Sequence, residues 1–339
     1  MYYLENCVER LFREKTVENM IVKVGRGADV LCEIKRSAQD RVLTDQTLFD
    51  MASITKIVVT TSLALIAIDR GLLSLSDRVS RFFPVPEDKE SMTVRHLLTH
   101  TIGIGHQSLL ESNGEHGEIQ DYILRIPSKI PIGSNVLYSC PGFILLGRIL
   151  EKVYQKRLDA AFYELVAAPL KMMSSVFLPD RTKDIVNSNL DEQDKGIVND
   201  YNSRFLGGVC GNAGLFSCLA DITRYTKMLI SNGSPLISEK LFALATQNFT
   251  PNMNESRGLG YLYVDERYDQ AFGLFPSGSI GHCGYTGQSL FVDPKSGLYV
   301  IVLSDATVST ARKYGKINYE EVKLMRHDLH AAIKADLTE

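Results

Sequence analysis

The chain has 339 residues, of which 45% are hydrophobic and 23% are charged, and its formal net charge is −3. This composition is typical of a globular protein with one large or about two smaller domains, and the lack of a basic cluster excludes a nucleic-acid-binding surface. The longest apolar run, residues 57–68, is too short to span a bilayer, and the N-terminus lacks the basic end and apolar core of a signal peptide. We therefore predict a cytoplasmic protein that binds neither nucleic acid nor membranes.

The N-terminal region predicts a helix, a β-hairpin and a second helix. In residues 4–15, apolar side chains recur at helical spacing on one face. Residues 20–24 and 30–34 are rich in β-formers and flank a glycine-containing turn, which is typical of a hairpin. The next helix is expected to begin near Ser53 and to end at Arg70, because the glycine that follows can adopt the left-handed conformation that stops a helix.

Helical patterns dominate the middle of the chain, from residue 72 to about residue 250. Helices are expected at residues 91–100, 142–154 and 158–165, and Pro169 is expected to end the last of them. A glycine-rich bend follows at residues 207–214. The strand signal is weak throughout this region.

The C-terminal part returns to the period-two pattern of strands. Ser217 is expected to cap a helix that precedes this part. Residues 288–293 and 298–303 then predict two strands joined by a turn, and residues 319–335 predict a final helix.

This order favours an α/β (α+β) fold with an antiparallel sheet flanked by helices. We expect a sheet domain built from residues 1–71 and 255–339. A mostly helical domain, residues 72–254, would be inserted into it. The active site is then expected in the cleft between the two domains.

Ser53 and Lys56 are the first candidates for chemistry. They stand three residues apart, so they share one face at the head of a helix. A hydroxyl beside an amine suits nucleophilic catalysis. However, a chain of this length contains roughly one such pair by chance, and Ser53 could instead cap the helix.

Two more segments place reactive side chains near glycines, whereas several familiar site patterns are missing from the sequence. The two segments are Tyr138-Ser139-Cys140 and residues 282–287. The sequence has no Gly-x-Ser-x-Gly elbow, His-Glu-x-x-His motif or phosphate-binding loop.

No Cys-x-x-Cys pair occurs, so we predict no metal, no cofactor and reduced thiols at all six cysteines, Cys7, Cys32, Cys140, Cys210, Cys218 and Cys283.

The order and spacing of these segments resemble the serine β-lactamase-like superfamily, which includes class C β-lactamases, penicillin-binding proteins and family VIII-type esterases. Residues 49–56 look like its Ser-x-x-Lys box, and residues 138–140 look like its Tyr-x-Asn box. Residues 282–284 resemble its Lys-Thr-Gly box in the known His-x-Gly form. The resemblance covers about residues 30–305, with further similar segments at 96–103, 169–172 and 208–217.

The resemblance implies a β-lactamase/transpeptidase-like fold and an acyl-enzyme formed at Ser53. Lys56 or Tyr138 would take the Ser53 proton, and the residues leave this choice open. Burial near a positive group is expected to lower the pKa of Lys56. The backbone N–H groups of Ser53 and Tyr285 would form an oxyanion hole. The implied substrate-binding residues are Cys140, His282, Cys283 and Gly284.

Two cysteines depart from the family pattern. Cys140 stands where the family has an asparagine that helps bind a substrate amide, and Cys283 replaces a threonine or a similar small residue. A thiol forms only weak hydrogen bonds. We therefore predict a carboxylesterase-like serine hydrolase that acts on a small-molecule ester.

Two other functions stay open. The first is a peptidase or amidase acting on D-amino-acid or muropeptide substrates, or a weak β-lactamase. The second is a catalytically weak binding or sensor protein that keeps the fold. The oligomeric state is not predicted, and no role is assigned to four histidines, His96, His100, His106 and His116.

Overall fold

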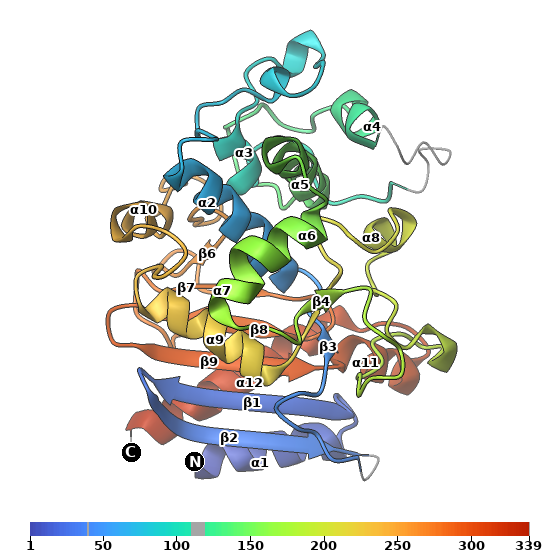
Figure 1. The fold of residues 1–339 in the computed structure, drawn as a ribbon. Helices are drawn as coiled ribbons and strands as arrows, with labels where there is room; N and C mark the ends of the chain where they lie inside the picture. The colour runs from blue at the N-terminus through green and yellow to red at the C-terminus, as the bar shows by residue number, and fades with distance from the viewer. Residues whose placement is uncertain (39–40, 110–118, 339) are drawn as a thin grey trace.

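A six-stranded antiparallel sheet forms the base of the molecule (Figure 1). The computed structural model describes residues 1–38, 41–109 and 119–338. The strand order is β2-β1-β9-β8-β7-β6, so that β1 from the N-terminal part pairs with β9 from the C-terminal part. The strands are β1 (Asn19–Arg26), β2 (Asp29–Ser37), β6 (Leu262–Tyr263), β7 (Ile280–Cys283), β8 (Ser289–Val292) and β9 (Leu298–Ser304).

The sheet buries both of its faces. Successive side chains of a strand point to opposite faces, so Val300 and Ile301 of β9 belong to different hydrophobic clusters. One face packs against α1 (Tyr2–Arg13) and α12 (Tyr319–Thr338). The other face packs against helices from the middle of the chain. This explains why β9 has no period-two burial: each of its residues is buried on one side or the other.

The middle of the chain is mostly helical and lies above the sheet in Figure 1. A π-helical segment, Lys56–Thr61, leads directly into α2 (Ser62–Asp69), which is buried. The other α-helices of the described chain are α3 (Val94–Leu98), α4 (Ile119–Arg125), α5 (Cys140–Tyr154), α6 (Leu158–Phe162), α7 (Ala168–Leu170), α8 (Tyr201–Phe205), α9 (Leu219–Ile230), α10 (Glu239–Ala245) and α11 (Ala306–Tyr314).

A second, three-stranded sheet connects this helical part to the candidate site. It has the order β3-β5-β4, with the strands β3 (Phe49–Asp50), β4 (Val176–Phe177) and β5 (Leu215–Ser217). Phe49 pairs with Ser217 and Asp50 pairs with Phe216. These bonds hold the backbone immediately before Ser53.

The predicted α/β (α+β) fold is confirmed, and so are its longer elements. The N-terminal helix, the first hairpin, α5, β8, β9 and α12 form as expected, and Gly71 ends its helix with a φ of 70°. The short strands β6 and β7, the small sheet and α11 were not predicted. The division into two domains at residues 71/72 and 254/255 stays a prediction.

Two local expectations were wrong. Pro169 does not end a helix at residue 165, because the helical path continues through it to Leu170 and stops at Lys171, which has a φ of 58°. Pro169 lies where a π-helical segment, Tyr163–Ala167, passes directly into α7. Ser217 does not cap α9, because it is the last residue of β5 and its hydroxyl contacts that of Ser175 at 2.7 Å.

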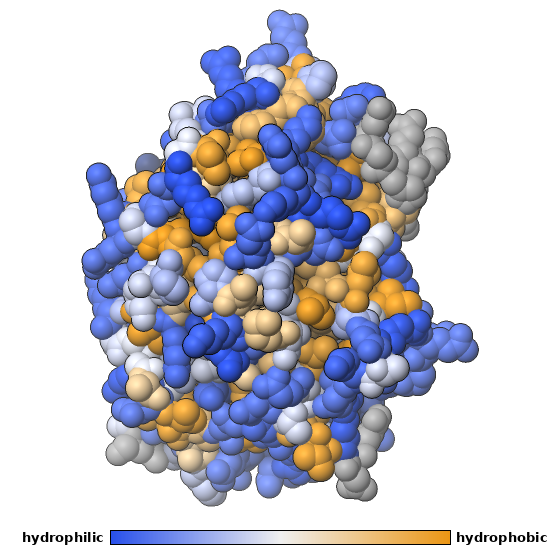
Figure 2. Space-filling model, viewed as in Figure 1, coloured by the Kyte–Doolittle hydropathy of each residue, from blue (hydrophilic) through white to orange (hydrophobic). Residues whose placement is uncertain are grey.

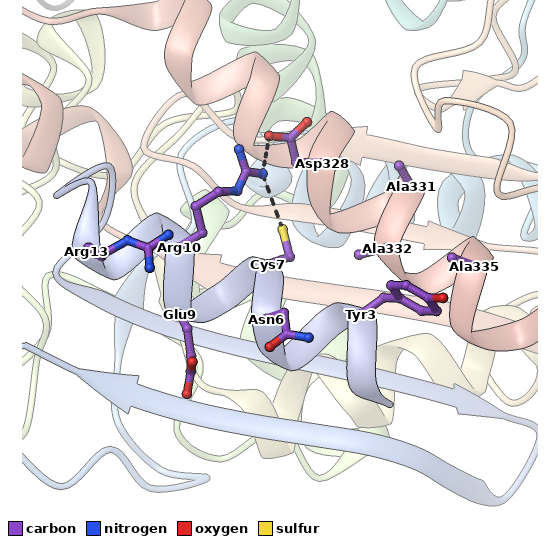
Figure 3. A pocket seen from close by; sticks show the side chains of 10 residues that line it. All are labelled: Tyr3, Asn6, Cys7, Glu9, Arg10, Arg13, Asp328, Ala331, Ala332 and Ala335. Carbon is purple, nitrogen blue, oxygen red and sulfur yellow. Dashed lines mark hydrogen bonds and ion pairs between the residues drawn. The ribbon is translucent and has the colours of Figure 1, made fainter.

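The outer surface is mixed in character. On the face shown in Figure 2, hydrophilic side chains cover much of the surface and apolar ones are interspersed among them. Figure 3 shows a groove between α1 and α12, where Arg10 bonds to Asp328 at 2.6 Å and lies near Cys7. This groove is on the side of the sheet opposite the helical part. Within the described residues, no helix is long and apolar enough to cross a membrane.

Candidate active site

Ser53 follows a strained turn at the end of β3. The Met51 N–H donates to the Leu215 carbonyl at 2.9 Å, and the Ala52 N–H donates to Asp50 Oδ1 at 2.9 Å. Ala52 has a φ of 44°, which a residue with a Cβ rarely adopts. The flanking bonds hold this conformation and leave Ser53 half-buried in front of the fully buried π-helical segment.

The Ser53 hydroxyl contacts two of the predicted partners. Lys56 Nζ donates to Ser53 Oγ at 3.0 Å, and the Tyr138 hydroxyl donates to the same oxygen at 2.8 Å. Lys56 also donates to the Asn212 carbonyl at 2.9 Å, and its Nζ lies 3.4 Å from Cys140 Sγ. Asn212 belongs to the glycine-rich bend, so this bend helps to fix the lysine. The structure thus brings the Ser-x-x-Lys and Tyr-Ser-Cys segments together.

The start of α5 sets the positions of Tyr138 and Cys140. Ser139 caps this helix, with its Oγ accepting from the Gly142 N–H at 3.0 Å. Tyr138 therefore precedes the cap, and Cys140 is the first residue of the helix. The ring of His100 lies 4.6 Å from the Tyr138 ring and holds its orientation by packing.

The segment from β7 onward lies against the backbone before Ser53. A Cβ on Gly284 would come within 3.0 Å of the Met51 carbonyl oxygen, so only glycine allows this approach without a shift. Thr286 Oγ1 donates to the Asp50 carbonyl at 3.2 Å. Among the described residues, neither the Ser53 nor the Tyr285 N–H has a hydrogen-bond partner, so both predicted oxyanion donors are free.

The electrostatics of the site differ from the expectation for Lys56. Burial by itself would lower the pKa of Lys56, but the acidic Cys140 thiol and the Tyr138 phenol outweigh burial and raise this pKa above its ordinary value. The prediction of a lowered lysine pKa was therefore wrong. Burial raises the pKa of Tyr138 to about 12, although Lys56 acts in the opposite direction.

Cys140 is an acidic thiol. Burial would raise the pKa of Cys140, but the Lys56 ammonium and a hydrogen bond with His106 outweigh burial and hold the pKa below its ordinary value. The same hydrogen bond raises the pKa of His106. Lys56 thus has a partner that becomes negative more readily than an ordinary thiol. An asparagine at this position would carry no charge.

His282 and Cys283 differ from each other in their surroundings. His282 is buried, which lowers its pKa well below the ordinary value, and its Nδ1 bonds to the Cys283 carbonyl at 2.8 Å. Its ring centroid lies 6.1 Å from that of Tyr138, so the third predicted segment reaches the same site. Cys283 is half-buried, and burial raises the pKa of its thiol. All six cysteines are free thiols in the structure.

Three residues of the site were not predicted from the sequence. His100 packs on Tyr138, His106 bonds to Cys140, and the guanidinium of Arg257 lies 5.8 Å from the Tyr138 ring centroid. Of the two histidines, only His100 carried a signal in the sequence, because it belongs to the family-like segment 96–103, whereas nothing marked His106 or Arg257. His116 lies outside the described residues. Within the described ranges, no group of three or more His, Cys, Asp or Glu side chains is placed to hold a metal ion.

Comparisons with known proteins identify the family of the chain. The sequence profile of the beta-lactamase family matches residues 4–322. Esterase EstB of Burkholderia gladioli is 28% identical, over 89% of this chain and 89% of that protein. An Escherichia coli K12 protein whose name proposes it as a D-alanyl-D-alanine carboxypeptidase is 26% identical, over 77% of this chain and 70% of that protein.

A solved structure shows the same fold. EstCE1, described as a hydrolase with promiscuous acyltransferase activity, superimposes with a TM-score of 0.76 over 97% of this chain and 98% of that chain, at 19% identity. At this identity the likeness concerns the fold alone. Together with the profile match, which spans most of the sequence, it leads to one conclusion: the chain belongs to the beta-lactamase family.

Proposed function

We propose that the protein is a serine hydrolase that forms an acyl-enzyme at Ser53 and prefers carboxylic esters. The observation that carries this proposal is the pair of contacts at Ser53 Oγ, 3.0 Å from Lys56 Nζ and 2.8 Å from the Tyr138 hydroxyl. A serine hydroxyl is a weak nucleophile until a neighbouring group accepts its proton. Both groups that could accept it stand within hydrogen-bond distance.

The reaction has two acyl-transfer steps. Ser53 Oγ attacks the carbonyl carbon of the ester, the bond to the leaving alcohol breaks, and the Ser53 proton reaches that alcohol through Lys56 or Tyr138. Water then attacks the acyl-enzyme, the carboxylic acid leaves, and the proton returns to Ser53. The free N–H groups of Ser53 and Tyr285 stabilise the oxyanion in both steps.

The choice between Lys56 and Tyr138 as the proton acceptor stays open in this proposal. Their titrations are coupled through Cys140, because a negative thiolate raises the pKa of both. Cys140, His282, Cys283 and Gly284 line the substrate side of the site. No cofactor takes part in the proposed reaction.

The preference for esters rests on Cys140 and on one relative. A thiol does not offer the combined donor and acceptor of an asparagine amide, so an amide substrate loses a partner at this position. Esterase EstB is matched over 89% of this chain and 89% of its own length, more than the relative named as a carboxypeptidase, which is matched over 77% and 70%. The second candidate is a peptidase or amidase on D-amino-acid or muropeptide substrates, favoured by the relative named as a D-alanyl-D-alanine carboxypeptidase.

Covalent labelling tests the proposal. A fluorophosphonate should modify the wild-type protein at Ser53, located by peptide mass mapping, and Ser53→Ala should abolish both labelling and hydrolysis of p-nitrophenyl butyrate. Ser134→Ala, at an exposed serine, is the matched control and should change neither.

Two results would contradict the proposal. If Ser53 is not labelled and no short-chain ester is hydrolysed, the binding or sensor function is favoured. If D-alanyl-p-nitroanilide or nitrocefin is turned over far better than the ester, the ester preference is wrong and the amidase or β-lactamase activity replaces it.

A further inference from the structure

Helix α12 places a buried arginine against the segment that follows β7. Arg326 is 4% exposed, and its Nη2 donates to the Gly284 carbonyl. Among the described residues its Nε has no hydrogen-bond partner, and the ion pairs of α12 involve other side chains of the helix. Burying a guanidinium without a carboxylate is costly, so packing alone does not explain this residue.

The peptide group that Arg326 contacts carries one of the two expected oxyanion donors. The Gly284 carbonyl and the Tyr285 N–H belong to one trans peptide bond, so they point in opposite directions. Helix α12 packs on one face of the large sheet, whereas the residues that flank Ser53 belong to the hydrophobic cluster on the other face. A carbonyl held toward α12 therefore directs the Tyr285 N–H away from α12, to the side where Ser53 lies.

A second contact from α12 holds the side chain of Tyr285. Tyr319 is the first residue of α12 and precedes Arg326 by seven residues, or two helical turns, so both lie on one face of the helix. The rings of Tyr319 and Tyr285 stack, with their centroids 5.1 Å apart and their planes at 20°. The Arg326 guanidinium carbon lies 5.8 Å from the Tyr319 ring centroid. One helix thus fixes both the backbone and the ring of Tyr285.

The charge of Arg326 acts on the same segment. Burial raises the pKa of the Cys283 thiol, and Arg326 is the charge that most opposes this rise. A cation at a carbonyl oxygen polarises the peptide group, which makes its N–H a stronger donor. An oxyanion gains more from a strong, fixed donor than the neutral carbonyl of an ester does, so the effect is larger in the transition state than in the ground state.

We propose that Arg326 and Tyr319 are positioning residues, which hold the Gly284–Tyr285 peptide so that its N–H faces the oxyanion of the reaction. Neither side chain touches the substrate in this proposal. The inference rests on the proposed ester hydrolysis at Ser53.

Arg326→Met tests the positioning role, because it removes the charge and the donor but keeps much of the side-chain length. With p-nitrophenyl butyrate, kcat should fall by about 10- to 100-fold and KM should stay within about 3-fold, since losing an oxyanion donor altogether costs about 10²- to 10³-fold in kcat. Arg326→Lys should restore part of the loss, because lysine keeps a charged donor but lacks the planar fork.

Arg10→Met is the matched control for a general loosening of α12. Arg10 also ties this helix down, through Asp328 at 2.6 Å, but its hydrogen bonds go to Asp328 and Cys7 and not to the segment 284–286 (Figure 3). The free energy of unfolding in urea is measured for both variants. In Arg10→Met, kcat should stay within about 2-fold of the wild type, because a contact remote from the reacting atoms adds no stabilisation specific to the transition state.

A transition-state analogue separates positioning from structural damage. 1-Butaneboronic acid forms a tetrahedral anion on the Ser53 oxygen, and one of its oxygens takes the place of the oxyanion. Its inhibition constant should rise in Arg326→Met by the factor by which kcat/KM falls, and it should not change in Arg10→Met. If Arg326→Met does not fold, Tyr319→Leu decides instead: the lost ring stacking should lower kcat by about 3- to 10-fold at unchanged KM.

The outcomes distinguish this inference from the proposed function. A kcat of the wild-type size in Arg326→Met (or in Tyr319→Leu, where that variant decides), a loss confined to KM, or an equal loss in Arg10→Met would overturn the role of α12 and leave the hydrolase intact. If Ser53 is not labelled and no ester is hydrolysed by the wild type, both proposals fail together.

Discussion

Replacing Cys140 by asparagine should move the pH–rate profile to lower pH. The Cys140 sulfur lies 3.4 Å from Lys56 Nζ, and its negative form raises the pKa of Lys56 and of Tyr138. Asparagine carries no charge, so the variant loses this effect. Whichever of the two groups accepts the Ser53 proton, it becomes available at a lower pH.

The expected size follows from Coulomb's law. At the observed separation of 3.4 Å, a thiolate and an ammonium attract each other by about 5 kcal/mol at an effective dielectric constant of about 20, and by about 1 kcal/mol in water. Since about 1.4 kcal/mol corresponds to one pH unit, the rising limb of the profile should move down by about 1 to 4 units. Activity near neutral pH should rise accordingly.

The assay is kcat/KM for p-nitrophenyl butyrate between pH 5 and pH 10.5. Cys140→Ser should move the profile in the same direction as Cys140→Asn, because a serine hydroxyl is also uncharged over this range. Cys283→Ser is the matched control: burial raises the pKa of the Cys283 thiol, whereas that of Cys140 is lowered, so the loss of Cys283 should leave the limb in place. The reasoning is refuted if the limb does not move in Cys140→Asn, or if activity disappears because the thiol itself transfers the proton.

Three more predictions follow from single contacts. Tyr138→Phe should lower kcat by about 10²- to 10⁴-fold with little change in KM, and a retained kcat would leave Lys56 alone as the base. Gly260→Ala should lower the unfolding free energy, measured in urea, by at least about 2 kcal/mol more than Gly207→Ala does. Both glycines have a positive φ, but only a Cβ at position 260 would meet a side chain, with Thr61 Oγ1 at 1.9 Å. Equal losses in the two variants would contradict this clash.

The last of the three concerns stability against pH. Burial lowers the pKa of His330 to about 4, so between about pH 6.5 and pH 4 the unfolded chain binds a proton that the folded chain does not. The unfolding free energy should therefore fall by roughly 3 kcal/mol as the pH drops through this window. In His330→Asn this decrease in the unfolding free energy should be missing. If urea unfolding gives the same dependence of the unfolding free energy on pH for both proteins, His330 does not have a lowered pKa in the folded state.

The sequence by itself determined the elements with strong local patterns. Helix α12 and the hairpin of β1 and β2 follow from periodicity and turn residues, and the spacing of Ser53 and Lys56 places both on one helical turn. The strand β6 escaped prediction because two residues show no period, and β7 escaped because its four residues, Ile280-Gly281-His282-Cys283, include a glycine and only one strong β-former. β7 pairs with β8, which follows it closely in the chain, and β6 pairs with β7 across a longer loop.

The tertiary structure alone decided the environment of the site. Tyr138 reaches Ser53 from 85 residues away, and Arg257 reaches the Tyr138 ring from still farther along the chain. The direction of the Lys56 pKa could not be predicted from the residue types, because burial and a negative neighbour act in opposite directions and both depend on distance. The local pattern therefore names the candidate nucleophile, whereas its electrostatic partners are set by contacts between segments that only folding brings together.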